Sequence, residues 1–185
     1  IVEEPEVEFI YREFYLKTNA IGWGMFIPNV AYEFELDDRW SVDIPFYYSG
    51  GYNYFKEEIK FRCIVFQPEL RYYLNKNKNF YAGAHAGIGW YNFALNRDYR
   101  IQDAKGIHPA WGGGLSLGYR LKFKKNDYWT IDFCLGAGVY DVHYDMFYNE
   151  SNGPLAKSNI HDTFFGIDKL SVSFSYHLGT LKDIK

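Results

Sequence analysis

Histidine and serine are the residue types of this sequence that could act in acid–base or nucleophilic chemistry. The histidines are His85, His108, His143, His161 and His177. An esterase needs an activated serine beside a histidine, and only Ser175 and His177 lie two residues apart on one predicted strand face. We expect both to point into the interior of the fold, away from an outer-leaflet lipid. The pair is therefore interpreted as packing or hydrogen bonding, and no catalytic residue is predicted.

Metal-ligating residue types gather in the last third of the chain. They are Asp141, His143, Asp145, His161 and Asp162. These side chains could crowd one loop region, but no compact spacing such as HxxxH appears among them. Asp141 and His143 have outward parity near a loop end, which favours solvation at the level of lipid headgroups. We therefore predict no metal and no cofactor.

Two further motifs are weak indicators of chemistry. Glu33 and Glu35 share a strand face, but a glycosidase would need an accessible cleft between its carboxylates. Gly112, Gly113 and Gly114 are followed by no predicted helix, so they do not form a phosphate-binding loop.

The elements that must position these side chains are strands throughout. Two-residue alternation recurs along the 185 residues, and no useful length shows an apolar period of 3.6 residues. The predicted strands cover residues 11–21, 28–37, 39–49, 58–74, 80–95, 107–123, 128–145 and 164–178. Eight is an even number, as in bacterial outer-membrane barrels. Pro68 lacks a ladder donor, so we expect a bulge there.

The connections between these strands alternate in length, apart from the first, at residues 22–27, which is shorter and apolar. Those at residues 37–39, 75–79 and 124–127 are short and polar, whereas those at 50–57, 96–106 and 146–163 are longer. Short turns on the periplasmic side and long loops outside are typical of an up-and-down outer-membrane barrel. We expect the barrel at 11–178, with a periplasmic segment at 1–10 and a polar tail at 179–185.

The two faces of the strands differ in polarity. In the strand from Tyr128, apolar side chains from Trp129 to Val139 alternate with a face that carries Thr130 and Asp132. The polar faces together hold five cations and five anions. They are Lys17, Glu33, Glu35, Asp43, Glu69, Arg71, Arg120, Lys122, Asp132 and Lys169. Buried charges must be paired, and eight strands enclose a space that side chains can fill. We therefore predict a filled polar lumen with a balanced charge network.

Aromatic residues make up 21% of the chain, which favours a location between lipid and water. The tryptophans fall at two predicted levels, two after short turns and three near the long-loop ends. They are Trp23, Trp40, Trp90, Trp111 and Trp129. We interpret them as aromatic girdles at the two membrane interfaces. A soluble lipocalin-like barrel would alternate in the same way with its apolar face inside.

Composition excludes several other classes. A net charge of −3 gives no footprint for nucleic acid, and no run of eighteen apolar residues predicts a transmembrane helix. The acidic start at Ile1 is interpreted as a mature product whose signal peptide has been removed. Cys63 and Cys134 have no metal-type spacing, and we expect two free buried thiols.

Several strings, in their order and spacing, resemble a family of small uncharacterised proteins from Bacteroidetes. They include Leu16–Asn19, Arg39–Ser41, Gln67–Tyr73 and Gly112–Tyr119, and the similarity covers roughly residues 14 to 178. The resemblance implies an outer-membrane barrel from a domain family of unknown function, with members sometimes linked to fimbrial or surface-assembly loci.

These observations together predict a non-enzymatic integral barrel of the bacterial outer membrane, with both termini in the periplasm. We expect it to be a structural or accessory subunit that contacts outer-membrane lipid and other outer-membrane or surface proteins. A lipid-modifying enzyme and a soluble ligand-binding barrel are the alternatives.

Overall fold

The computed structural model describes residues 9–50, 60–94, 97–150 and 152–184. This part of the chain is all-β, with one antiparallel sheet and one short helix. The elements are β1 (Phe9–Asn19), α1 (Ala20–Gly24), β2 (Asn29–Glu35), β3 (Trp40–Gly50), β4 (Lys60–Phe66), β5 (Glu69–Tyr73), β6 (Phe80–Ala94), β7 (Tyr99–Asp103), β8 (Ala110–Phe123), β9 (Asn126–Tyr148) and β10 (Leu155–Ile184). No helix among the described residues is long and apolar enough to span a membrane.

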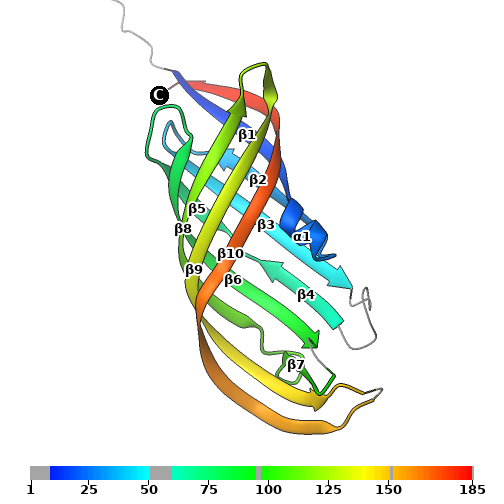
Figure 1. Cartoon of the computed structure of the whole chain (residues 1–185). Coiled ribbons are helices and arrows are strands. Elements are labelled where there is room, and N and C mark those ends of the chain that lie inside the picture. The colour runs from blue at the N-terminus through cyan, green and yellow to red at the C-terminus, as the bar shows by residue number, and fades with distance from the viewer. Residues whose placement is uncertain (1–8, 51–59, 95–96, 151, 185) are drawn as a thin grey trace, which may run out of the picture.

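The strand pairings close the sheet into a ring (Figure 1). β1 pairs with β2 on one side and with β10 on the other, and β10 pairs in turn with β9. β4 and β5 share one position between β3 and β6. β7 and β8 likewise share one position between β6 and β9. The eight predicted strands therefore correspond to eight positions in the ring.

A proline causes the interruption between β4 and β5. β4 ends at Phe66 and β5 begins at Glu69, because Pro68 has no N–H to donate to a ladder. Its carbonyl still accepts from the amide of Ala86 at 3.1 Å, and the amide of Gln67 donates to Pro45 at 3.3 Å. The predicted irregularity at this proline is confirmed.

Three stretches predicted as loops or tail are strands instead. β9 and β10 cover most of the predicted loop 146–163 and form a hairpin that projects beyond the other strands (Figure 1). β7 lies within the predicted loop 96–106, and the predicted tail continues β10 as far as Ile184, opposite Phe9. Backbone pairing needs no apolar alternation, so the polar side chains there misled the prediction. Residues 51–57 of another predicted loop and 1–8 of the N-terminal segment lie outside the described residues.

A helix replaces the end of the first predicted strand. The Asn19 side chain accepts from the amide of Ile21 at 3.0 Å and so caps α1. β1 consequently leaves the ring at Asn19, which lies opposite Ser173 of β10. Residues of β10 before Ser173 pair with β9 alone, and α1 contacts β10 near this seam.

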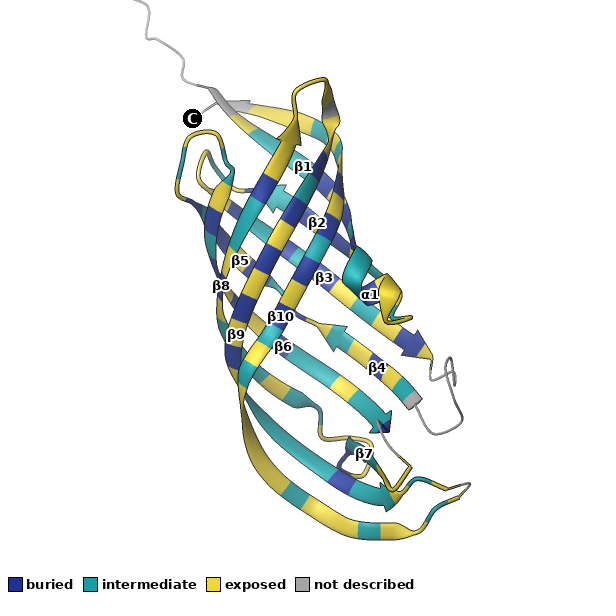
Figure 2. Cartoon of the chain, viewed as in Figure 1, coloured by how far each residue is buried: buried dark blue, intermediate teal, exposed yellow. Residues whose placement is uncertain are grey.

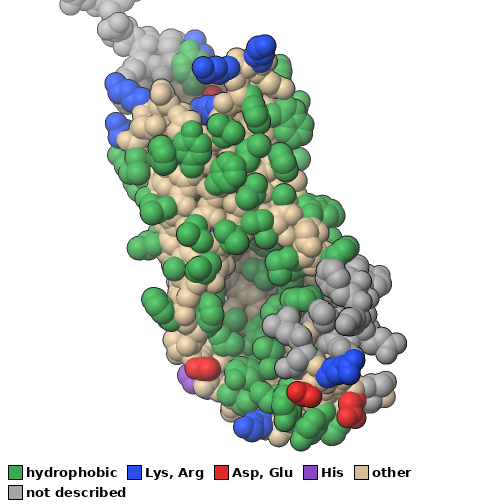
Figure 3. All heavy atoms as spheres, viewed as in Figure 1, with side chains coloured by type: hydrophobic (Ala, Val, Ile, Leu, Met, Phe, Trp, Pro, Cys, Tyr) green, Lys and Arg blue, Asp and Glu red, His purple; other side chains and the backbone are tan. Residues whose placement is uncertain are grey.

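Buried and exposed residues alternate along the strands (Figure 2). On β9, Thr130, Asp132 and Cys134 are buried, while Trp129, Phe133 and Leu135 are exposed. The predicted sidedness, with apolar side chains outside and polar ones inside, is therefore confirmed for the described strands. Hydrophobic side chains cover the visible outer surface, with Lys and Arg gathered at the end that carries the short turns (Figure 3). Both cysteines are buried and free, as predicted.

Candidate functional site

Glu33 of β2 lies at the centre of a buried ion network near the short-turn end. Its carboxylate accepts from Lys17 Nζ at 2.8 Å, Arg71 Nη1 at 2.9 Å and Arg120 Nη2 at 2.6 Å. The Tyr73 hydroxyl donates to its second oxygen at 2.8 Å. Glu33 and Arg120 are both fully buried. Three cations on one carboxylate require further anions nearby to balance the charge.

Asp132 and Asp43 supply part of that balance. Asp132 lies 2.6 Å from Lys17 Nζ and 2.7 Å from Arg120 Nε, and Asp43 lies 2.7 Å from Arg71 Nη2. These contacts join β1, β3, β5, β8 and β9 across the interior. The contact between Lys17 and Asp132 therefore joins β1 to β9, two strands that do not pair with one another.

Glu69 carries the network toward the middle of the molecule. Its carboxylate lies 2.7 Å from Arg71 and 3.0 Å from Lys169, and the Ser116 hydroxyl donates to it. Four cations now face four carboxylates, so the buried network is neutral. Its members are Lys17, Arg71, Arg120, Lys169, Glu33, Asp43, Glu69 and Asp132.

Tyrosine rings fill the space around the guanidinium groups. The Arg71 guanidinium carbon lies 4.5 Å from the ring centre of Tyr81, and that of Arg120 lies 4.7 Å from Tyr15. Cation–π attraction adds to ion pairing in such contacts. A Cβ at Gly118 would overlap the Tyr81 ring. This glycine therefore makes room for a long side chain from the neighbouring strand β6.

Nine of the ten predicted network residues are buried, and one is not. Lys122 of β8 is exposed, so its placement in the network is a correction. It is on the same face of β8 as Arg120 but lies two residues closer to the end of the strand, where the interior meets solvent. Glu35 is buried but pairs with Lys78 at 2.6 Å, outside the central network. Lys78 lies in a short turn and has no alternation that could have identified it.

All five tryptophans lie on the exterior of the ring, and their assignment to membrane interfaces stays a prediction. Their exposed fractions run from 38% to 61%. Trp40 begins β3, and Trp129 lies three residues after the start of β9, both at the short-turn end. Trp90 and Trp111 lie toward the other ends of β6 and β8, and Trp23 lies in α1.

A second polar group lies past Lys169, farther from the short turns. His85 Nε2 lies 2.6 Å from Asp168 Oδ2, which also lies 3.4 Å from Gln67 Nε2. Gln67 donates to the Tyr140 hydroxyl at 3.0 Å. Asp168 Oδ1 and His85 Nδ1 are buried and have no hydrogen-bond partner among the described residues. Sequence reasoning missed the pair, because its members lie 83 residues apart on different strands.

A cavity of about 820 Å³ begins at this polar group. Asp168, Lys169, Gln67 and Tyr140 line its base. Most of the remaining lining is apolar and comes from α1, β4, β6, β9 and β10. It includes Ile21, Met25, Val65, Ile88, Val142 and Phe164. A hollow is visible from outside between β10 and β4, next to the seam where β1 leaves the ring (Figure 3). The described lining contains no serine.

The Ser175 and His177 pair of the sequence does not assemble. The Ser175 hydroxyl lies 3.4 Å from Asp132 within the ion network, whereas His177 Nε2 lies 3.3 Å from the Thr180 hydroxyl. Neither residue lines the cavity. Their contacts agree with the interpretation as packing and hydrogen-bonding residues.

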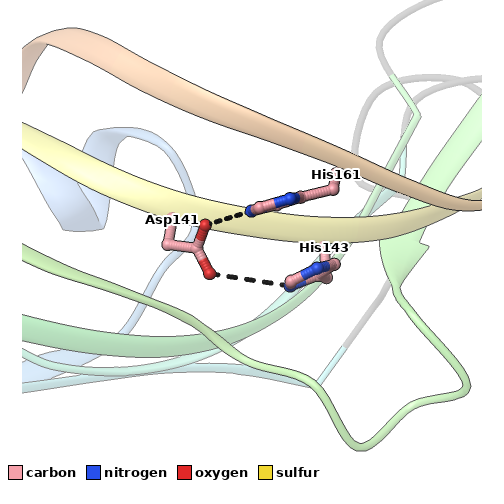
Figure 4. A group of neighbouring side chains, drawn as sticks. All are labelled: Asp141, His143 and His161. Atoms are coloured by element: carbon pink, nitrogen blue, oxygen red, sulfur yellow. Dashed lines mark hydrogen bonds and ion pairs between the residues drawn. The ribbon is translucent and has the colours of Figure 1, made fainter.

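Three of the five candidate metal-ligating residues come together on the outer face of the β9–β10 hairpin. They are Asp141, His143 and His161 (Figure 4). The hydrogen bond from His161 holds the pKa of Asp141 below its usual range. Asp145 points elsewhere and accepts from the amides of Asn159 and Lys105, which lower its pKa. No compact ligand spacing appears in the sequence, because hairpin pairing brings together His143 and His161, which are 18 residues apart.

Comparison with known proteins adds a family but no activity. The family model described as "Protein of unknown function (DUF3575)" matches residues 4–178. The chain belongs to this family. An uncharacterised family is what the resemblance in the sequence indicated. No curated protein and no solved structure matches the chain.

Proposed function

We propose that this DUF3575 chain is an integral outer-membrane β-barrel, eight-stranded and up-and-down, without catalytic activity. Its short-turn half, filled by the ion network, is the rigid anchor, and its cavity half accepts a lipid chain from the surrounding bilayer. The barrel serves as a structural or accessory subunit beside other outer-membrane or surface proteins. Both termini and the short turns lie in the periplasm.

One observation carries the membrane location. Eight ionised groups are buried in the interior, while large apolar side chains around the ring are exposed. In water this arrangement would expose a large hydrophobic surface to solvent. It would also carry the desolvation cost of burying eight charged groups. In a bilayer the same surface faces hydrocarbon, and the closed sheet satisfies its backbone hydrogen bonds internally.

The position of the tryptophans supports the same orientation. Trp40 and Trp129 lie at one end of the apolar exterior, and Trp90 and Trp111 lie toward the other. Indole rings favour the level of the lipid headgroups. Lys and Arg lie beyond the first of these levels, on the short turns (Figure 3).

The cavity supports lipid uptake because of where its mouth lies. Exposed Phe164, Phe165 and Leu170 of β10 line the cavity together with Ile21 of α1 and Met25, which directly follows that helix. In a bilayer the molecules at this mouth are lipids, and an acyl chain matches the apolar walls. Asp168 Oδ1 offers a buried, unused acceptor at the base, so a lipid with a hydroxyl or amide donor fits best.

The test is extraction of the intact protein from native membranes, followed by mass spectrometry of the lipids that co-purify. We expect the protein in the outer-membrane fraction, soluble only in detergent, with about one retained lipid per chain. Val142→Trp adds a ring on the cavity lining and should remove that lipid. Val139→Trp is the matched control, because Val139 lies on the same strand but faces outward.

Each arm of this experiment can contradict the proposal. A protein that stays monodisperse in buffer without detergent would rule out the membrane location. Equal lipid retention by the two tryptophan variants would rule out the cavity as the lipid site. It would not contradict the proposal that the protein is a membrane barrel. A retained lipid that has been hydrolysed or transferred would contradict the non-enzymatic assignment. Co-purification with no other outer-membrane or surface protein would argue against an accessory subunit.

A further inference from the structure

Hairpin register places two histidines side by side on the outer face of β9 and β10. His143 and His161 are direct cross-strand partners, and their rings stack with centres 4.1 Å apart and planes 10° apart. Cross-strand partners on one face have neighbouring Cβ atoms, so the two imidazoles are held together by the sheet itself. Both are at least one-third exposed and accessible from solvent.

A carboxylate completes the group. Asp141 lies two residues before His143 on β9, so it shares that outward face. One oxygen contacts His161 Nε2, and the other lies 3.6 Å from His143 Nδ1 (Figure 4). One ligand atom from each residue lies within 4.8 Å of the others.

These atoms suit a small divalent transition-metal ion. Zn²⁺ binds imidazole nitrogen and carboxylate oxygen at about 2.0–2.2 Å, so ligand atoms around one tetrahedral ion lie roughly 3.3 Å apart. Small side-chain rotations would bring the present atoms to that separation. Imidazole ligands favour Zn²⁺ over Ca²⁺ or Mg²⁺, which prefer oxygen ligands.

A neighbouring strand adds further side chains beside the carboxylate. Trp111 of β8 is the register partner of Asp141, so its indole lies on the same outward face. His108, in the connection before β8, has its ring centre 6.0 Å from that of His143. The group therefore bridges three neighbouring strand positions.

We propose that Asp141, His143 and His161 form a Zn²⁺ site with one coordination position left for water. The site lies on the exterior of the hairpin, separate from both the ion network and the cavity. A bound ion would cross-link β9 to β10 where β10 lacks its second neighbour. This inference revises the expectation of no metal and does not depend on the proposed lipid function.

The test is isothermal titration of the full chain with ZnCl₂ after treatment with EDTA. We expect one saturable site per chain, and His143→Asn or His161→Asn should each weaken the affinity by more than about tenfold, because each removes a ligand. His177→Asn is the control, since it removes a histidine of β10 that lies outside the group and contacts Thr180. It should leave Zn²⁺ binding unchanged.

A second readout does not depend on affinity. Co²⁺ in place of Zn²⁺ should give the visible absorption of a four- or five-coordinate ion in the wild type and in His177→Asn, and lose it in His161→Asn. Absence of saturable Zn²⁺ binding by folded wild-type protein would overturn the proposal. So would equal loss of binding in all three histidine variants.

Discussion

The interior of the closed sheet is filled differently in its two halves. The short-turn half is packed with paired ions and tyrosine rings, and Arg71, Arg120 and Glu33 are almost wholly buried. The other half holds a cavity of about 820 Å³ with apolar walls. His85 and Asp168 lie at the boundary between the halves.

The difference follows from the strands that surround each half. Around the ion network, except at Lys169, β1 pairs with both β2 and β10, so every strand position has two neighbours. Beyond Asn19, β1 gives way to α1, and the ring has a seam. A complete ring can confine charges that stabilise one another, whereas a seam leaves space that a mobile ligand can enter. We expect the first half to control stability and the second to control binding.

The largest effect is expected from breaking the network at its centre. Arg120→Met leaves Glu33 and Asp132 short of a buried partner, so the free energy of unfolding should fall by about 3–5 kcal/mol. Lys122→Met, at the exposed end of the same strand, should change it by less than about 0.5 kcal/mol. Urea titration of the protein refolded in vesicles would measure both. Similar losses in the two variants would show that burial of the network does not determine stability.

A smaller effect is expected from one hydrogen bond to the same carboxylate. Tyr73→Phe removes the donor that lies 2.8 Å from Glu33 and should cost about 2 kcal/mol, as bonds to charged groups do. Tyr72→Phe is the matched control, because that hydroxyl accepts from Arg39 at the exposed outer face. The same urea titration applies. A neutral Tyr73→Phe variant would mean that Glu33 is already satisfied by its cations.

The smallest effect on stability is expected at the cavity. Asp168→Asn keeps the shape of the side chain next to His85 and should cost about 1 kcal/mol or less, in line with one ordinary hydrogen bond. In Asp168→Asn, the amount of co-purified lipid should fall clearly, whereas the midpoint of urea unfolding should shift only slightly. A loss of unfolding free energy as large as that of Arg120→Met would show that the residues at the cavity stabilise the fold as much as the ion network does. The two halves would then not differ in their contribution to stability.

Much of this protein could be predicted from the sequence, because alternation is a local property. Strand existence, the inward parity of residues such as Arg71 and Asp132, and the outward parity of Trp40 and Trp129 follow from a two-residue period. The interruption at Pro68 follows from its missing N–H. The extent of β9 and β10 did not follow, because exposed strands in a hairpin carry no apolar alternation.

Only the tertiary structure decided which of these side chains meet. Lys122 and Arg120 have the same parity, and depth along the strand alone separates an exposed lysine from a buried arginine. His85 with Asp168, and Asp141 with His143 and His161, are brought together by strand register and ring closure. Parity fixes the face of a residue within one strand, whereas contact across the interior depends on how all eight positions are staggered.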